Sequence, residues 1–234
     1  FPMAEAATLC VLLSGFWLLH TKGIPERLPV ALREFIADNR GPIRFIEPED
    51  VSRLAFPRFG GPAAAVPTIL VWGDSHAEAA WPALDMLSRR HRRPGALAAL
   101  SACPPVLGPL ESHRPFHNTS HCLRLNEAVI AAVSRFAIKD VILAAHWSQY
   151  RPESERFRAG LASAVESLGQ AGARVWILED TPDLPFNPSR MAKRRFVPDG
   201  ALAPFTFSRD EYDRQRAVFR GMVARLGEAA PFRL

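Results

Sequence analysis

The 234-residue sequence contains only three cysteines, and none lies in a CxxC pair or in a Cys/His arrangement with the spacing of a zinc site. GxGxxG and P-loop patterns are also absent, so a nucleotide-binding fold has no direct support. The formal net charge is only +5, and the basic clusters lack the interleaved aromatic residues that bind single-stranded nucleic acid. We therefore expect neither a metal site nor a nucleic-acid partner.

The amino-terminal residues 4–20, AEAATLCVLLSGFWLLH, are mostly apolar but lack the basic region and small-residue cleavage site of a signal peptide. They are slightly shorter than the roughly 20 residues that a helix needs to cross a bilayer. The sequence also begins with Phe rather than Met. We interpret residues 1–21 as the end of a transmembrane helix whose start is missing, and we expect attachment to a membrane.

Residues 22–66 are rich in proline and only weakly periodic, which is typical of an irregular connection with at most a short helix near residues 30–38. Strands and helices then alternate. We expect strands at 68–72, 96–100, 141–145 and 174–179, helices at 77–91, 123–136, 153–170 and 209–226, and the start of another strand in the final PFRL. Apolar strands that alternate with helices predict a parallel sheet covered on both faces, which is a three-layer α/β/α fold.

The first of these strands leads directly into Gly73-Asp74-Ser75-His76, and a helix is expected to follow. Ligands bind at the carboxyl ends of the strands in open α/β sheets. A serine there would lie at the amino end of a helix, where free N–H groups and the helix dipole favour an oxyanion. Alternatively, Asp74 and Ser75 only cap the helix, because both are favoured capping residues.

Two further strand ends fall on the same edge of the sheet, SACPP at residues 101–105 and AAHW at residues 144–147. Cys103 and Cys122 are 19 residues apart in a loop-rich stretch, whereas Cys10 lies in the apolar amino-terminal run. The pair is either two unrelated thiols or, in an oxidising compartment, a disulfide that closes a loop.

These strand ends resemble the SGNH hydrolase-like domain that is fused behind the acyltransferase-3 membrane domain in bacterial polysaccharide and lipopolysaccharide O-acetyltransferases. The segment ILVWGDSHAEAAWPAL is similar to that family's nucleophile block, and DVILAAHWSQY is similar to its third block. TPDLPFNPSRMAKRR resembles the segment after the fourth strand, and LLHTKGIPERLP resembles the end of the last membrane helix. The resemblance implies a flavodoxin-like α/β/α sheet over residues 67–234, a periplasmic linker at 22–66 and the end of the last transmembrane helix at 1–21.

The resemblance also implies the roles of several residues. Ser75 would be the nucleophile that accepts the acyl group, and Asp74 would support its turn. The Ser75 N–H would be one oxyanion-hole donor, and the backbone near Ser101 or Ala102 would supply a second. SACPP followed by Cys122 is similar to the family's paired cysteines, so Cys103 and Cys122 are expected to be bridged.

The third block departs from the family pattern. SGNH enzymes have Gly-x-Asn-Asp there, with the Asn as an oxyanion donor, whereas this sequence has Ala144, Ala145, His146 and Trp147. We expect His146 and Trp147 in the cleft, with His146 either donating a hydrogen bond or only lining the surface.

A serine nucleophile needs a base, which SGNH proteins supply from a DxxH block near the carboxyl end. No histidine follows Trp147, and the seven in the sequence are at positions 20, 76, 91, 113, 117, 121 and 146. His76 follows Ser75 directly, and neighbouring helical side chains point about 100° apart. We expect the base to lie outside this sequence, so that the fragment alone has negligible serine-dependent turnover.

The resemblance thus predicts an O-acyltransferase, specifically an O-acetyltransferase, that modifies hydroxyls of a cell-envelope polysaccharide or lipopolysaccharide from the periplasmic side of the bacterial inner membrane. It implies no cofactor in this domain, because the acyl donor, acetyl-CoA, would be used by the membrane domain. Two alternatives remain open. The domain could be an SGNH esterase that uses water as the acceptor, or a non-catalytic module that binds a glycan.

Overall fold

The computed structural model describes residues 2–21, 46, 48–62, 64–108, 119–179, 181–184 and 207–229. The chain divides into one compact unit of Phe1–Arg40 with Leu184–Thr206, and a second of Gly41–Asp183 with Phe207–Leu234. The helix expected near residues 30–38 and the strand expected at 231–234 lie outside the described residues.

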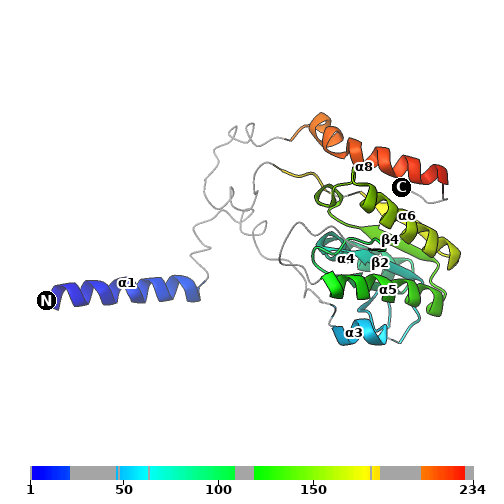
Figure 1. Ribbon diagram of the computed structural model, residues 1–234. Helices are drawn as coiled ribbons and strands as arrows, with labels where there is room; N and C mark the ends of the chain where they lie inside the picture. Colours follow the sequence, from blue (N-terminus) through cyan, green and yellow to red (C-terminus); the bar gives the residue numbers. More distant parts are fainter. Residues whose placement is uncertain are drawn as a thin grey trace. The chain divides into compact units, whose positions relative to one another are not determined.

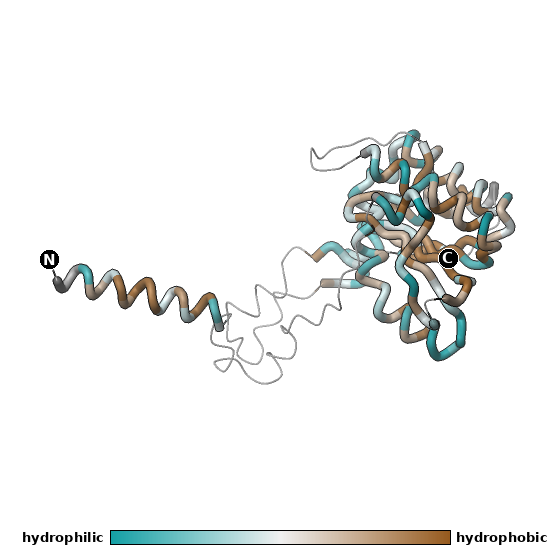
Figure 2. Tube along the Cα trace, turned by 90° about the horizontal axis from the view of Figure 1, so that it is seen from below, coloured by the Kyte–Doolittle hydropathy of each residue, from teal (hydrophilic) through white to brown (hydrophobic). Residues whose placement is uncertain are grey.

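Helix α1, Pro2–His20, makes up most of the described part of the first unit. Its large apolar side chains from Leu9 to Leu19 are exposed. Figure 2 shows the hydrophobic residues of this helix in brown along the trace. Among the described residues, no helix combines the length and the apolar character needed to span a bilayer. The transmembrane assignment of residues 1–21 therefore stays a prediction.

The second unit contains a five-stranded sheet in the order β1-β3-β2-β4-β5. The parallel strands are β2 (Ile69–Gly73), β3 (Gly95–Ala99), β4 (Asp140–Ala144) and β5 (Arg174–Leu178), and the short edge strand β1 (Arg58–Phe59) is antiparallel to β3. Gly73 pairs with both Ala99 and Ala144, so the carboxyl ends of three neighbouring strands lie level. This alignment brings the loops after β2, β3 and β4 to one edge of the sheet.

Helices cover both faces of the sheet, as the alternation of strands and helices predicts (Figure 1). The covering helices are α4 (Ser75–Arg90), α5 (Thr119–Phe136), α6 (Glu155–Gln170) and α8 (Arg209–Ala229). Val71 of β2 packs with Ala77 of α4 in one core cluster, whereas Leu70 and Trp72 belong to the larger cluster with residues of α5, α6 and α8. Successive strand side chains point to opposite faces, so a continuous apolar strand can fill both cores.

The domain begins earlier than the sequence pattern indicates. The expected linker at 22–66 includes helix α3 (Pro48–Arg53) and strand β1, and Ile46, Val51, Phe56 and Phe59 are buried in the two core clusters. These elements are too short to have a recognisable period, and they are held by packing against the rest of the domain.

Gly73, the last residue of β2, is required by a close approach of two backbones. A Cβ at this position would lie 1.7 Å from the Ala144 carbonyl oxygen. The absence of a side chain lets the first turn of α4 begin directly beside the end of β4, which fixes where the residues after Gly73 are placed.

Candidate active site

Ser75 lies where strand β2 passes into helix α4. Asp74 is the N-cap of α4, and its side chain accepts a hydrogen bond from the His76 N–H at 2.8 Å. Ser75 is the first helical residue and is exposed, and neither its N–H nor its hydroxyl makes a hydrogen bond to any residue that the structure describes. The two interpretations of this turn are therefore compatible, because Asp74 caps the helix and leaves the Ser75 hydroxyl and N–H available to a ligand.

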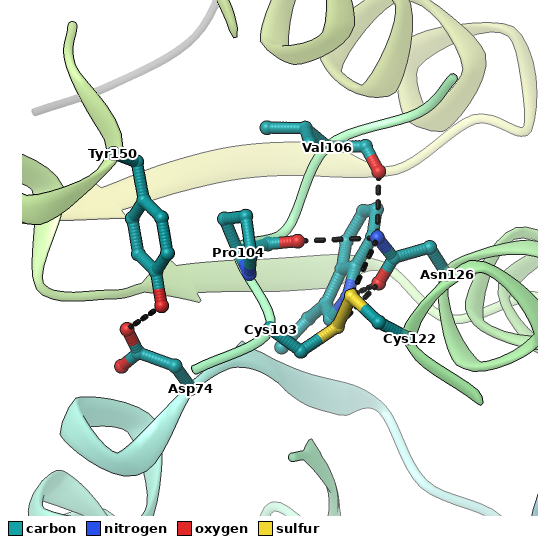
Figure 3. Close-up of a disulfide and its surroundings, with 8 residues drawn as sticks. Asp74, Cys103, Pro104, Val106, Cys122, Asn126 and Tyr150 are labelled. Carbon is teal, nitrogen blue, oxygen red and sulfur yellow. Dashed lines mark hydrogen bonds between the residues drawn. A yellow bond between two sulfur atoms is a disulfide. The ribbon is translucent and has the colours of Figure 1, made fainter. Parts of the chain in front are cut away.

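Asp74 also joins the start of α4 to the loop after β4. Its Oδ2 atom accepts hydrogen bonds from the His146 N–H at 2.9 Å and from the Tyr150 hydroxyl at 2.6 Å. Figure 3 shows the Tyr150 hydroxyl directed at this carboxylate. Asp74 is only 1% exposed, so these are hydrogen bonds to a buried charged group, which are among the stronger ones.

These contacts determine the charge state of Asp74. Burial alone would raise its pKa, but hydrogen bonds from the side chains of His76 and Tyr150 and from the backbone N–H groups of His146 and His76 outweigh it, so the pKa lies below its ordinary value. The pKa of Glu78, one helical turn further along α4, is raised, first by burial and then by the negative charge of Asp74. The carboxylate of Asp74 lies at the helix cap, where the N-terminal dipole favours a negative charge.

A cavity of about 400 Å³ opens beside Ser75. It lies between the start of α4, the end of β4 and the segment after β5, and it is lined by Ser75, His76, Ala79, Ala80, Ala144, Ala145, Leu178, Glu179 and Thr181. Four of these residues are alanines, so much of the cavity wall consists of small apolar side chains. A cavity of this size and lining can hold a small organic group together with part of a larger ligand.

His146 forms a hydrogen-bonded pair with Asp183, with 2.6 Å between Nε2 and Oδ1. The other carboxylate oxygen of Asp183 accepts a hydrogen bond from the Ser148 hydroxyl at 2.9 Å. The His146 ring also lies against the His76 ring, with 4.6 Å between ring centroids. His146 therefore contacts the residues on both sides of Ser75, through its backbone to Asp74 and through its ring to His76.

Asp183 is held in place by helix α8. The Gln215 side chain donates to the Asp183 carbonyl at 3.0 Å and accepts from the Asp183 N–H at 3.1 Å. Arg216, which is 1% exposed, donates to the Thr181 carbonyl and lies 3.7 Å from the Asp183 carboxylate. Burial acts to raise the pKa of Asp183, and contacts from Ser148 and His146, followed by the charge of Arg216, lower it overall, so the carboxylate is ionised at neutral pH.

Three further residues expected at the site, Ser101, Ala102 and Trp147, do not line the cavity. Trp147 is fully buried and stacks on Phe219 of α8. Its indole N–H donates to the carbonyl of Leu178 at 2.8 Å, so it holds in place a residue that lines the cavity.

Ser101 and Ala102 follow β3, whose end is joined to β2 by a hydrogen bond from the Leu100 N–H to the Gly73 carbonyl at 3.1 Å, and neither lines the cavity beside Ser75. The oxyanion-hole donor expected from the backbone near these two residues stays a prediction.

Cys103 and Cys122 form a disulfide, with their Cα atoms 5.5 Å apart, and Cys10 is a free, exposed cysteine. The buried Asn126 side chain lies beside this bridge (Figure 3). Its amide donates to the Pro104 and Val106 carbonyls at 3.1 and 2.6 Å. Its oxygen accepts from the Trp72 indole at 3.0 Å, so the loop after β3 is fixed to both α5 and β2.

Sequence reasoning missed Tyr150 and Asp183. Tyr150 lies within the segment that resembles the third block, and Asp183 within the segment after the fourth strand, but nothing in the local pattern indicates their partners. In the part of the chain that the structure describes, no group of three or more His, Cys, Asp or Glu side chains could hold a metal ion.

Together, the fold and this site define an α/β domain with an exposed serine at a strand-to-helix turn, beside a small apolar cavity and a His–Asp pair. The family described as the SGNH domain fused to AT3 domains matches residues 37–234, and the chain belongs to that family. A comparison with curated proteins finds no match.

A solved structure with a similar fold is that of the periplasmic domain of the lipopolysaccharide acetyltransferase from Salmonella ser. Paratyphi A. The two superpose with a TM-score of 0.58 at 12% sequence identity, over 88% of this chain and 79% of that chain. At this identity the similarity concerns the fold.

Proposed function

We propose that this domain transfers an acetyl group to a hydroxyl of a cell-envelope polysaccharide or lipopolysaccharide through an ester on Ser75. The observation that carries the proposal is the Ser75 turn, where an exposed hydroxyl and an open N–H at a helix terminus border the cavity. The family is consistent with this chemistry, because its members are fused to AT3 domains. The acetyltransferase whose periplasmic domain has a similar fold supports the choice of acyl group.

In the proposed reaction, the Ser75 oxygen attacks the carbonyl carbon of the donor, and the leaving group departs with a proton. The oxyanion forms near the Ser75 N–H, where the N-terminal dipole of α4 stabilises it. A sugar hydroxyl then attacks the ester carbon, the bond from that carbon to the Ser75 oxygen breaks, and the proton of the sugar hydroxyl passes to the Ser75 oxygen. Dividing the transfer into two steps gives each a lower barrier than direct transfer. The alanine-rich wall of the cavity suits the methyl group of an acetyl ester.

We further propose that the domain works outside the cytoplasm, tethered through residues 1–21, and receives its acetyl group from a membrane domain that uses acetyl-CoA. The Cys103–Cys122 disulfide supports this location, because such bonds persist in oxidising compartments.

The test measures acetyl transfer from an aryl acetate to cell-envelope glycan acceptors by the chain and its Ser75→Ala variant. Ser163→Ala, an exposed serine on α6, is the matched control. The sequence predicts little serine-dependent turnover by this chain alone, and we expect whatever transfer is measured to be lost in Ser75→Ala and retained in Ser163→Ala. Release of acetate without glycan acetylation would identify an esterase. Glycan binding with no difference between the chain and Ser75→Ala would identify a binding module.

A further inference from the structure

The cavity beside Ser75 is larger than an acetyl group requires. Its volume is about 400 Å³, whereas an apolar cavity of about 150 Å³ is enough to hold a benzene ring. The methyl group of an acetyl ester on Ser75 would therefore fill only a small part of it. The remaining space is available to a longer chain that begins at the same serine oxygen.

The walls of this cavity favour an apolar chain. Ala79 lies four residues after Ser75 on α4, so the two residues are neighbours on one face of the helix. The sheet contributes Ala144 from the end of β4 and Leu178 from the end of β5. Leu178 is 43% exposed, so an apolar ligand in the cavity would remove part of its side chain from water, which favours binding.

The polar part of the lining does not suit a charged chain. Glu179 is the acidic residue of the lining, and both of its carboxylate oxygens accept hydrogen bonds from Arg220 of α8, at 2.6 and 2.8 Å. No lysine or arginine is among the described residues that line the cavity. A carboxylate at the end of an acyl chain would therefore lose water without gaining a cationic side chain as its partner. The occupant that fits is an uncharged alkyl chain.

We propose that this cavity binds the acyl chain of the Ser75 ester and accepts propionyl and butyryl groups at least as well as acetyl, an inference that rests on the proposed role of Ser75. Ala79 determines how much of the cavity a chain can use, because a larger side chain there would occupy the space next to Ser75. This domain then does not restrict transfer to acetyl groups, and the donor decides which acyl group reaches the glycan.

Replacement of Ser75 by cysteine allows the preference of the cavity to be measured without an acyl donor or a base. In a Cys10→Ala background, Ser75→Cys supplies one free thiol, because Cys103 and Cys122 are bridged. A helix N-terminus favours the thiolate, which attacks an alkyl methanethiosulfonate, so that a disulfide to the alkyl group forms and methanesulfinate leaves. Intact mass gives the rates for the methyl, ethyl, propyl and butyl reagents, each divided by the rate with free cysteine.

We expect the normalised rate to rise by about two- to fourfold for each added methylene, where the upper figure corresponds to complete burial. Ala79→Leu, made in addition to Ser75→Cys, should remove this rise, whereas Ala83→Leu should leave it unchanged. Both alanines are exposed on α4 and leucine is a good helix former, but of the two only Ala79 lines the cavity. Leu178→Ala should reduce the rise, because it removes apolar area from the wall.

A hydroxyethyl reagent has nearly the shape of the propyl reagent but ends in a hydroxyl, so a cavity that binds the polar acceptor would favour it. A faster reaction with this reagent than with the propyl reagent would overturn the proposal. A rate that does not rise with chain length, or an equal rise in Ala79→Leu, would overturn it as well. These results would leave acetylation of Ser75 unaffected, whereas glycan acetylation that proceeds with Ser75 unmodified would contradict the proposed function.

Discussion

Replacement of Asp74 by asparagine tests how the start of α4 is held to the loop after β4. The carboxylate accepts on both oxygens, from the His76 N–H on one side and from the His146 N–H and the Tyr150 hydroxyl on the other. An asparagine has one acceptor oxygen, so its NH₂ group must face a backbone N–H on one of the two sides. A buried donor is left without an acceptor whichever way the amide is turned.

The expected cost follows from the hydrogen bonds that the substitution removes. Leaving a buried donor unpaired costs about 1–3 kcal/mol, and each hydrogen bond to a charged group contributes about 1.5–3 kcal/mol. We therefore expect Asp74→Asn to lower the free energy of unfolding by about 2–5 kcal/mol at neutral pH, which leaves the domain folded if its stability is typical. Urea unfolding measures this change, with Asp210→Asn, an exposed aspartate on α8, as the control.

The pH dependence of the unfolding free energy provides a second check on this substitution. The pKa of Asp74 is lowered in the folded protein, so its carboxylate stabilises the fold above the ordinary aspartate pKa of about 3.9 and loses that effect as the pH falls through the folded-state pKa. The difference between the wild type and Asp74→Asn should thus narrow as the pH is lowered from neutral into the acid range. A difference below about 1 kcal/mol at neutral pH, or one that does not change with pH, would refute the hydrogen-bond argument.

Two further predictions concern the supports of the site. Gly73→Ala should destabilise the domain by about 2 kcal/mol or more in urea unfolding, because its Cβ would collide with the Ala144 carbonyl, whereas Gly169→Ala on α6, with open space around it, should be neutral or stabilising. Equal effects of the two substitutions would contradict the close approach at Gly73. Replacing Cys103 and Cys122 together with alanine should cost about 3 kcal/mol, because their bridge closes a loop of 19 residues, while Cys10→Ala should have no effect on unfolding. An unchanged midpoint in the double variant would show that the loop is held by Asn126 instead.

The sheet could be predicted from the sequence because its four parallel strands are continuous apolar runs, each bounded by turn residues. All four lie within one or two residues of their expected positions. Helix α3 and strand β1 could not be predicted, because their few residues show no period. They are stabilised by contacts with distant parts of the chain, namely the burial of Val51 and Phe59 and the pairing of β1 with β3.

The position of Ser75 was predictable for a local reason, since a strand that ends in Gly-Asp-Ser-His before a helix places the serine at the ligand-binding edge. The partners of the site were not predictable in this way. Asp183 is 37 residues from His146 and is positioned by Gln215 on α8, a further 32 residues along the chain. Trp147 was expected in the cleft, but its indole is fully buried because the turn after β4 directs it against Leu178 and Phe219.

The central claim is that Ser75 carries the acyl group, and the most direct test is to find that group on the protein. The chain is mixed with an aryl acetate, quenched with acid and digested, and the modified peptide is sequenced by mass spectrometry. The account predicts an acetyl ester on Ser75 that forms before free acetate accumulates and disappears faster when a glycan acceptor is added. Glycan acetylation that proceeds with Ser75 unmodified, or with the acetyl group on another residue, would contradict it.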